Sequence, residues 1–553
     1  GIKMMIESPT EFRHTLVEAF NTRPLANEEF WELGASEAPL PPYPPPDIKI
    51  GDSTLWKRTA VMLCCLHANM VLRGDYGGIG WNCPYTFGTE DLNLSLMSMK
   101  LFGDANSMNF ESLRYCVGEC LYGGKFNDPA DTKLLSNLIS WYINEDHITG
   151  TNRRESISLS SQSEERHLWL SPDDNSMTLT GVRDHIKGYP KGSHSDVIGL
   201  DVNAVMIKKK QEAHNVLHSI MLFETQGGHD DTLHTILADD EVRVILCNII
   251  HFLPNSTSYD EDHDNFRIAE DEFSNGLASS IVNKMWPLLD GKPQNAVMRH
   301  EVHFYKRMLN VITTSVFNAI EVLEGKINPS GKDKEIISKV REGNIANFWV
   351  GPPYQSTTLL WSFLRYFKSQ VKFFINWACQ GHPSLVWLGA FAFPRAYLSS
   401  LVQEKAFKDR VSSHVLELEF IPTRNGPTEP TEFMEGTVYL TGFYLESATW
   451  RWPDDEDDED GRLVNGDPIE VYTESPILRV RPVVIDEAGE EPEQSFELFK
   501  CPLYKTFSRV GRMSTHGTSD NLVTFVTFKT DRDPHIWSLR GAALLMQIET
   551  ELE

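Results

Sequence analysis

The chain has 553 residues, of which 41% are apolar and 23% charged, and its 78 acidic against 51 basic residues give a formal net charge of −27. This size predicts a globular protein with more than one core, and the charge argues against nucleic acid or the acidic microtubule surface as a direct partner. Eight scattered cysteines favour a reducing compartment over a disulfide framework. No signal peptide and no apolar run of about 18 residues is recognisable, so no membrane partner is expected.

The first 200 residues predict helices separated by polar connections. Residues 7–21 predict a short helix that ends before Pro24, and the run PLPPYPPPD at 39–47 predicts a linker because proline cannot continue a helix or a central strand. From 55 to about 142 the apolar residues recur at helical spacing, which indicates a compact helical bundle. Residues 146–195 are polar and predict a loop-rich connection.

The remaining residues change from helical to strand-like patterning. Residues 203–406 contain several amphipathic segments, and the apolar stretch LVWLGAFAFPRAYL at 385–398 predicts a buried helix. The triplet KKK at 208–210 predicts a solvated helix face. After residue 412, short β-branched and aromatic runs alternate with period two between turn residues, which indicates an antiparallel β domain, either a sandwich or a barrel. The fold class is therefore α+β.

Two ordered sequence blocks carry a family resemblance. One is CPLYKTFSRVGRMSTHGTSDN at 501–521, followed by VTFVTF and a closing WSLRGAALLMQI; the other is GWNCPYTFGTEDL at 80–92. Both blocks, and those between them, resemble axonemal dynein heavy chains in the same order over residues 5–553. The residues that fill family positions are Gly80, Trp81, Asn82, Pro84, Tyr85, Phe87, Gly123, Gly124, Pro394, Arg395, Cys501, Pro502, Tyr504, Lys505, Thr506, Arg540 and Gly541.

The resemblance implies a domain plan. Residues 1–50 would be the end of the last large AAA+ subdomain and a Pro-rich linker, and 51–195 the helical AAA+ lid with a loop-rich connection. Residues 196–410 would form the helical part of a dynein C-terminal domain and 411–553 its β part. The C-terminal domain would brace the AAA+ ring and regulate coupling between its modules, and the residues at family positions would be structural.

The same resemblance implies an ATP-driven microtubule motor of the cilium or flagellum axoneme. This segment would not itself be an enzyme, and ATP and magnesium would bind elsewhere in the motor. Partners would be the other AAA+ modules of the heavy chain, intermediate and light chains bound through a tail, and microtubules bound through a stalk. A free-standing scaffold that uses the β domain as a binding module, and a nucleotide hydrolase with an unrecognised site, remain as alternatives.

Local motifs for nucleotide or metal binding fit poorly. The closest match to a phosphate loop is GKINPSGKD at 325–333, which has a proline in the loop and Asp333 in place of the hydroxyl, so it predicts a helix-ending turn. GDYGGIG at 74–80 also predicts a turn. The acidic run DEDHDNFRIAED at 260–271 departs from a calcium loop at three positions and predicts a solvated loop.

The remaining reactive residues have structural explanations. Cys116 and Cys120, one helical turn apart, could share a metal with His229 and His234, but the spacing favours half-buried thiols and surface histidines. His67 is expected to be a hydrogen-bonded core histidine, and no Gly-x-Ser-x-Gly elbow is present. The seven carboxylates at 454–460 predict a solvated loop between strands, with docking to a basic surface as the alternative.

Overall fold

The computed structural model divides the protein into two large hydrophobic cores. One contains buried residues from Phe12 to Ala204 and the other buried residues from Val242 to Met546. We call the described residues of 11–204 the lid unit and those of 239–548 the C-terminal unit. The structure describes residues 11–32, 54–103, 108–149, 159, 171–172, 177–192, 194–226, 239–253, 292–350, 359–424, 437–452, 461–464, 472–484, 497–509, 520–530 and 532–548.

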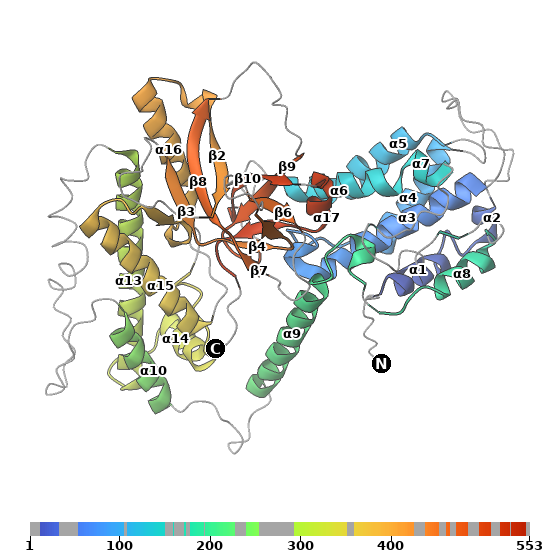
Figure 1. The fold of residues 1–553 in the computed structure, drawn as a ribbon. Coiled ribbons are helices and arrows are strands. Elements are labelled where there is room, and N and C mark those ends of the chain that lie inside the picture. Colours follow the sequence, from blue (N-terminus) through green and yellow to red (C-terminus); the bar gives the residue numbers. More distant parts are fainter. Residues whose placement is uncertain are drawn as a thin grey trace.

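The lid unit is helical, as the sequence predicts. Its elements are α1 (Phe12–Asn21), α2 (Glu28–Trp31), α3 (Thr54–Arg73), the 3-10 turn η2 (Gly74–Ile79), α4 (Thr89–Phe102), α5 (Phe110–Tyr115), the π-helical turn η3 (Cys116–Tyr122), the 3-10 turn η4 (Gly123–Lys125), α6 (Pro129–Tyr142), α7 (Glu145–Thr149), α8 (Leu179–Lys187) and the 3-10 turn η7 (Asp196–Ile198). The long helix α9 (Ala204–Gln226) then leaves the unit (Figure 1). Most of α3 is buried, which makes it the central helix.

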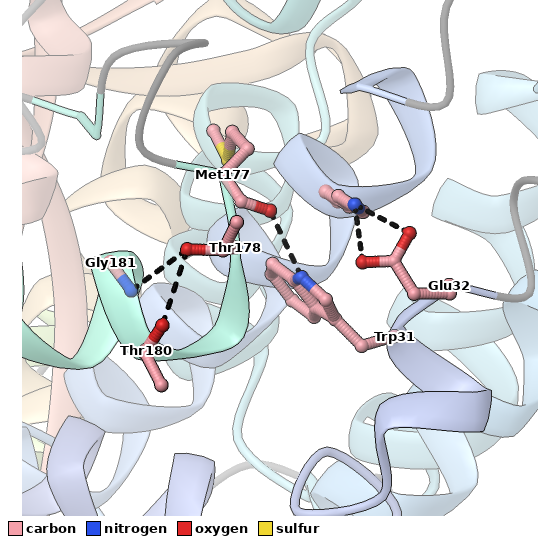
Figure 2. A network of polar contacts seen from close by, with 7 residues as sticks. Trp31, Glu32, Met177, Thr178, Thr180 and Gly181 are labelled. Atoms are coloured by element: carbon pink, nitrogen blue, oxygen red, sulfur yellow. Dashed lines mark hydrogen bonds and ion pairs between the residues drawn. The ribbon is translucent and has the colours of Figure 1, made fainter.

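Helix α8 corrects the prediction that 146–195 is a loop-rich connection. The Thr178 hydroxyl caps this helix by accepting from the N–H of Gly181, and Figure 2 shows this cap beside the indole of Trp31. Trp31 Nε1 donates to the carbonyl of Met177 at 3.1 Å and so ties α2 to the start of α8. Helix α8 is short and has few apolar residues, so its helical periodicity is hard to recognise within a polar, loop-like sequence.

The C-terminal unit begins with long helices. They are α10 (Asp239–Phe252), α13 (Pro293–Leu323), α14 (Gly331–Arg341), α15 (Leu360–Gln380) and α16 (Pro394–Asp409). Helix α13 packs against α10, α14 and α16. In Figure 1 the strands lie between α10, α13, α14 and α15 on one side and the lid unit on the other.

The strands form two mixed sheets. The first has the order β1-β3-β8-β2 and the second the order β5-β6-β10-β9-β11-β4-β7. Their bounds are β1 (Leu385–Trp387), β2 (Leu416–Thr423), β3 (Val438–Thr441), β4 (Tyr444–Glu446), β5 (Thr449–Arg451), β6 (Arg462–Val464), β7 (Tyr472–Glu474), β8 (Ile477–Val484), β9 (Glu497–Tyr504), β10 (Leu522–Thr530) and β11 (Ala543–Leu545). The short helix α17 (Pro534–Leu539) connects β10 to β11.

The α+β class is confirmed, but the sheets are not purely antiparallel as expected. The pairs β1 with β3, β6 with β10 and β9 with β11 are parallel, and the described strands form no closed barrel. Parallel neighbours need crossover connections, and helices α16 and α17 lie in the connections from β1 to β3 and from β9 to β11. The alternation of apolar and polar residues along a strand indicates which side chains are buried, but it does not indicate whether neighbouring strands run parallel or antiparallel.

The segment at 385–398 corrects the prediction of a single buried helix. Val386 is buried in β1 and pairs with Leu440 of β3, a 3-10 turn (Leu388–Ala390) follows, and α16 starts only at Pro394. The stretch is buried as predicted. A fully apolar run fits a central strand as well as a helix, so periodicity cannot separate the two.

Candidate interdomain coupling site

The lid unit presents a rigid loop to the C-terminal unit. A Cβ at Gly80 would lie 1.7 Å from the carbonyl oxygen of Arg73, so only glycine lets the loop fold back on α3. Trp81 follows, with its ring centroid 6.1 Å from that of Tyr85 and 5.0 Å from that of Phe126. Its Nε1 donates to the carbonyl of Met70 at 3.1 Å. All of these ring contacts lie in the lid unit, so Trp81 is part of the lid core.

The next residue, Asn82, is held by the N-terminus of α6. Asp128 caps this helix by accepting from the N–H of Ala130 and of Asp131, and it also accepts from Asn82 Nδ2 at 3.0 Å. The carboxylate of Asp131 accepts from the backbone N–H of Asn82 at 2.9 Å and of Cys83 at 3.1 Å. Burial, reinforced by the charge of Asp128, raises the pKa of Asp131 to about 7.

Two side chains of the C-terminal unit complete the environment of Asn82. Asn82 Nδ2 donates to the hydroxyl oxygen of Tyr504, the last residue of β9, at 2.6 Å. Arg509 Nη1 donates to Asn82 Oδ1 at 3.3 Å. The Asn82 side chain therefore has both its amide hydrogens and its oxygen occupied, as a buried amide requires.

Arg509 connects three separate segments. Besides Asn82, its guanidinium donates to the carbonyl of Gly541 at 2.7 Å and forms an ion pair with Glu446 of β4. The side chains of Arg509 and Glu446 are only 2% and 4% exposed. Burial alone would lower the pKa of Arg509, but the carboxylate of Glu446 reverses this and raises it; burial raises the pKa of Glu446 against the opposing effect of Arg509.

A second arginine reaches across from the lid. Arg73 at the end of α3 is fully buried and donates to the carbonyls of Gly80 at 3.2 Å, Ile198 at 2.7 Å and Leu539 at 2.6 Å. Burial lowers its pKa to about 9. Since Leu539 belongs to α17 of the C-terminal unit, this arginine joins the two units through backbone carbonyls.

The backbones also meet directly. Gly541 has φ +67, and a Cβ there would lie 2.3 Å from the carbonyl oxygen of Ile79. Its neighbour Arg540 forms an ion pair with Asp201 at 3.4 Å. We call Arg73, Asn82, Tyr504, Arg509 and Gly541 the interdomain cluster. The contacts of this cluster are polar, and Leu539 adds apolar packing against the lid core.

Other family positions join the helices and strands of the C-terminal unit. Pro394 is the first residue of α16, and Arg395 donates to the carbonyls of Val523 at 3.1 Å and of Leu522 on β10. Lys505 Nζ donates to the carbonyl of Ala392 at 3.2 Å. These contacts tie the N-terminus of α16 to the sheet.

The remaining family positions lie apart from the interdomain cluster or support it from within one unit. Cys501 and Pro502 are buried in β9, and Thr506 Oγ1 accepts from Asn521 at 2.9 Å. Pro84, Tyr85 and Phe87 continue the lid loop, with Tyr85 and Phe87 packed on the lid core. Gly123 and Gly124 form the 3-10 turn before α6, and a Cβ at Gly123 would lie 2.0 Å from the carbonyl oxygen of Gly118.

Two residues of the interdomain cluster, and the acids that hold it, were not identified from the sequence. Arg73 and Arg509 belong to the cluster, Asp128 and Asp131 accept hydrogen bonds from Asn82, and Glu446 pairs with Arg509. Asp128 before Pro129 is a helix-start signal, and Glu446 is an acidic residue in an otherwise apolar strand segment, which is a signal for a buried charged partner. Arg509 lies in a turn-like run that gives no such signal.

The alternative chemical motifs resolve as follows. Gly325 ends α13 with φ +72, and Ser330 with Asp333 forms a capping box at the start of α14, so the loop 325–333 is a helix-ending turn as predicted. His67 is 4% exposed and hydrogen-bonds Tyr122 at 2.9 Å; burial lowers its pKa to about 4. This confirms a core histidine.

Other candidates lie on the surface or outside the described residues. Cys116 is half-buried and Cys120 exposed on η3, while His229, His234, the run 260–271 and the acid-rich 454–460 lie outside the described residues. The last of these joins β5 to β6, two antiparallel strands. Within the described part of the sequence, no group of three or more His, Cys, Asp or Glu could hold a metal ion, and no helix is long and apolar enough to span a membrane.

The lysine triplet 208–210 differs from its prediction. Lys208 is 5% exposed, and its Nζ pairs with Asp75 of η2 at 2.9 Å, whereas Lys209 and Lys210 are exposed. One side of the triplet therefore anchors α9 to the lid unit, because α9 packs against η2.

Comparison with known proteins identifies the family. A model of the dynein heavy chain AAA lid domain matches residues 56–204, and a model of the C-terminal domain of dynein heavy chains matches residues 210–546. The chain is 26% identical to dynein axonemal heavy chain 12 of Homo sapiens, over 99% of this chain and 16% of that protein. It is 25% identical to dynein axonemal heavy chains 3 and 1 of Homo sapiens, over 99% of this chain and 12% and 11% of those proteins.

The chain thus spans between 11% and 16% of the length of these relatives. The two matched regions meet at the start of α9, and the lid match lies within the lid unit. The C-terminal match alone covers more than half of the sequence. The chain belongs to the dynein heavy chain family, and its sequence corresponds to the AAA lid and the C-terminal domain of axonemal members.

Proposed function

We propose that this chain acts as the ring-closing lid and ring-bracing C-terminal domain of an axonemal dynein heavy chain. Residues 51–195 serve as the lid, 196–410 as the helical part and 411–553 as the β part of the C-terminal domain. Residues 1–50 form the end of the preceding large AAA+ subdomain and a Pro-rich linker, and α1 and α2 within them pack on the lid core. The observation that carries the proposal is the buried interdomain cluster, because it joins lid and C-terminal unit through directional polar contacts.

The proposed role is mechanical and regulatory. ATP with magnesium binds to other AAA+ modules of the heavy chain, and microtubules bind through its stalk. Intermediate and light chains attach to its tail, and the motor works in the axoneme of a cilium or flagellum. The axonemal names of the relatives support this assignment, as does the poor fit of the sequence to a phosphate loop.

The geometry of the cluster suits the transmission of force. Separating the two units would leave buried polar groups of Asn82, Arg73 and Arg509 without partners, at about 1–3 kcal/mol for each group. The contact between Gly541 and the carbonyl of Ile79 has no room for a side chain, so the two units cannot slide past each other there. A rotation of the lid would therefore carry the C-terminal domain with it.

Two glycine substitutions test this role in the full heavy chain. Gly541→Ala adds a methyl group that would meet the carbonyl oxygen of Ile79 at 2.3 Å. Gly343→Ala is the matched control, because Gly343 has φ +71 and nothing lies within 4 Å of the position that a Cβ would take there. Both positions have a positive φ near +70, so both variants carry backbone strain, but only Gly541→Ala places a methyl group against the other unit.

We expect Gly541→Ala to lower microtubule-gliding velocity and the microtubule stimulation of ATP hydrolysis. Gly343→Ala should change both far less. Basal ATP hydrolysis and microtubule binding without nucleotide should persist in both variants, since these activities belong to other modules. Equal gliding velocities for the two variants would refute a role of the interdomain cluster in the motor.

A further inference from the structure

A cavity of about 390 Å³ lies between the two units, beside the interdomain cluster. Ile79, Pro129 and Leu134 of the lid unit supply apolar walls. From the C-terminal unit, Phe499, Pro502 and Phe525 line the cavity. This volume falls in the range of roughly 300–1,000 Å³ that is usual for small-molecule sites, which also form preferentially between domains.

Charge in this cavity is opposite to that of the protein as a whole. Lys133 of α6, Lys500 of β9 and Arg509 line it, and Asp131 is the one acid among the described residues that form its walls. Lys133 and Lys500 are exposed, whereas the carboxylate of Asp131 already accepts two backbone hydrogen bonds. Because the charge of Arg509 is already paired with that of Glu446, Lys133 and Lys500 supply the positive charge at this apolar space, in a protein whose net charge is −27.

The start of α6 adds to this positive potential. Pro129, Ala130 and Asp131, the first three residues of this 14-residue helix, line the cavity. Backbone dipoles place partial positive charge at a helix N-terminus, although Asp128 and Asp131 offset part of it. An anionic group is therefore best placed near the exposed Lys133 and Lys500, away from the two aspartates.

We propose that this cavity binds a small amphipathic carboxylate. The aromatic or aliphatic body of the ligand would lie against Ile79, Leu134 and Phe499, and its carboxylate would pair with Lys133 and Lys500. This binding site goes beyond the proposed mechanical role. Because the ligand contacts both units, its binding would stabilise their contact by mass action.

The first test uses 2-naphthoate as the probe and its uncharged amide, 2-naphthamide, as the matched compound. Binding to the full chain is followed by titration calorimetry and by ligand-observed NMR. We expect 2-naphthoate to bind with a dissociation constant below about 1 mM and to bind at least about fivefold tighter than the amide. Equal binding of the two compounds, or no saturable binding, would overturn the proposal.

Variants then locate the site. Ala130→Trp should fill the cavity and abolish 2-naphthoate binding, while Ser136→Trp, at an exposed position on the same helix that does not line the cavity, should leave it intact. Circular dichroism checks that both variants fold. Unchanged binding by a folded Ala130→Trp variant would place the probe elsewhere and refute the site.

Charge variants keep the proposal testable if the tryptophan variant misfolds. Lys133→Gln with Lys500→Gln should weaken 2-naphthoate binding by at least about fivefold and leave 2-naphthamide binding unchanged. The double variant Lys209→Gln with Lys372→Gln, at exposed positions on α9 and α15 outside the cavity, controls for the change in net charge. An equal effect of this control variant would show non-specific attraction and contradict the assignment.

Discussion

Breaking the ion pair between Arg509 and Glu446 should strongly destabilise the protein. The two side chains are 2% and 4% exposed, so Arg509→Met leaves a carboxylate that water can hardly reach. Removal of one partner of a buried pair costs about 3–5 kcal/mol. The same substitution removes the hydrogen bonds to Asn82 and to the carbonyl of Gly541, so we expect the upper part of this range.

The double substitution Arg509→Met with Glu446→Leu should recover part of the loss. Neither charge then remains buried, and a well-packed apolar pair often stabilises as well as the ion pair it replaces. Urea unfolding of the single and double variants gives the coupling energy as a double-mutant cycle. The surface pair of Arg481 and Glu419, with side chains 50% and 40% exposed, is the control, and Arg481→Met should cost less than about 1 kcal/mol.

Two results would refute this reasoning. A loss of less than about 1 kcal/mol for Arg509→Met would place the pair in an environment as solvated as the surface control. Additive effects in the cycle would show that the two charges do not compensate each other.

The remaining predictions concern packing, pH and partners. Phe391 is 3% exposed and packs against the rings of Phe374 and Tyr397, so Phe391→Ala should cost about 3–5 kcal/mol and lower the melting temperature of the 196–553 unit in one calorimetric transition; unaltered melting of a separate β domain would contradict this. Burial raises the pKa of Asp131 and of Glu301 to about 7, so the folded state holds protons that the unfolded state has already lost between about pH 4 and pH 7. The free energy of unfolding should therefore fall as pH rises toward 7, by at most about 1.4 kcal/mol per pH unit for each carboxyl group. In urea unfolding the free energy of Asp131→Asn should fall less over this pH window than that of the unaltered protein, and an identical pH profile would refute the assignment. The isolated chain should show no ATP binding with a dissociation constant below about 10 μM by calorimetry. It should also stay in the supernatant when microtubules are pelleted at about 0.15 M salt, and salt-sensitive co-pelleting would count against the charge argument.

Much of the fold follows from local sequence patterns. The helices predicted from long amphipathic runs, such as α13 and α15, are confirmed. A 3.6-residue periodicity sustained over many turns fits a helix and does not fit a strand. The structure confirms the strands after residue 412, which their period-two alternation predicts. The turn at 325–333 is also confirmed, because Gly325 has a positive φ after α13 and a capping box starts α14.

Features that depend on long-range pairing were missed. The apolar run that contains β1 predicts a helix, but the structure shows a strand. The prediction fails because the partner strand β3 lies more than 50 residues later, and a short apolar run gives no sign of that partner. Strand direction in the sheets was missed for the same reason. Lys208 was expected in solvent, but Asp75, which pairs with it, comes from a distant turn.

Only part of the interdomain cluster could be identified from the sequence. The resemblance picked out Asn82, Tyr504 and Gly541 as family positions but gave no physical reason for their proximity. Their contacts join segments more than 400 residues apart in the sequence. Arg509 could not be recognised because its role depends on three segments that converge only in the folded protein.

Hydrogen exchange in the Gly541→Ala variant tests most directly whether the two units are coupled through the interdomain cluster. Mass spectrometry would follow one peptide over residues 78–83 of the lid loop and one over 537–542 of the C-terminal unit. If Gly541 holds the two together, both peptides lose protection, while peptides from the buried α3 and α13 keep theirs. Unchanged protection of residues 78–83 would contradict coupling at this site.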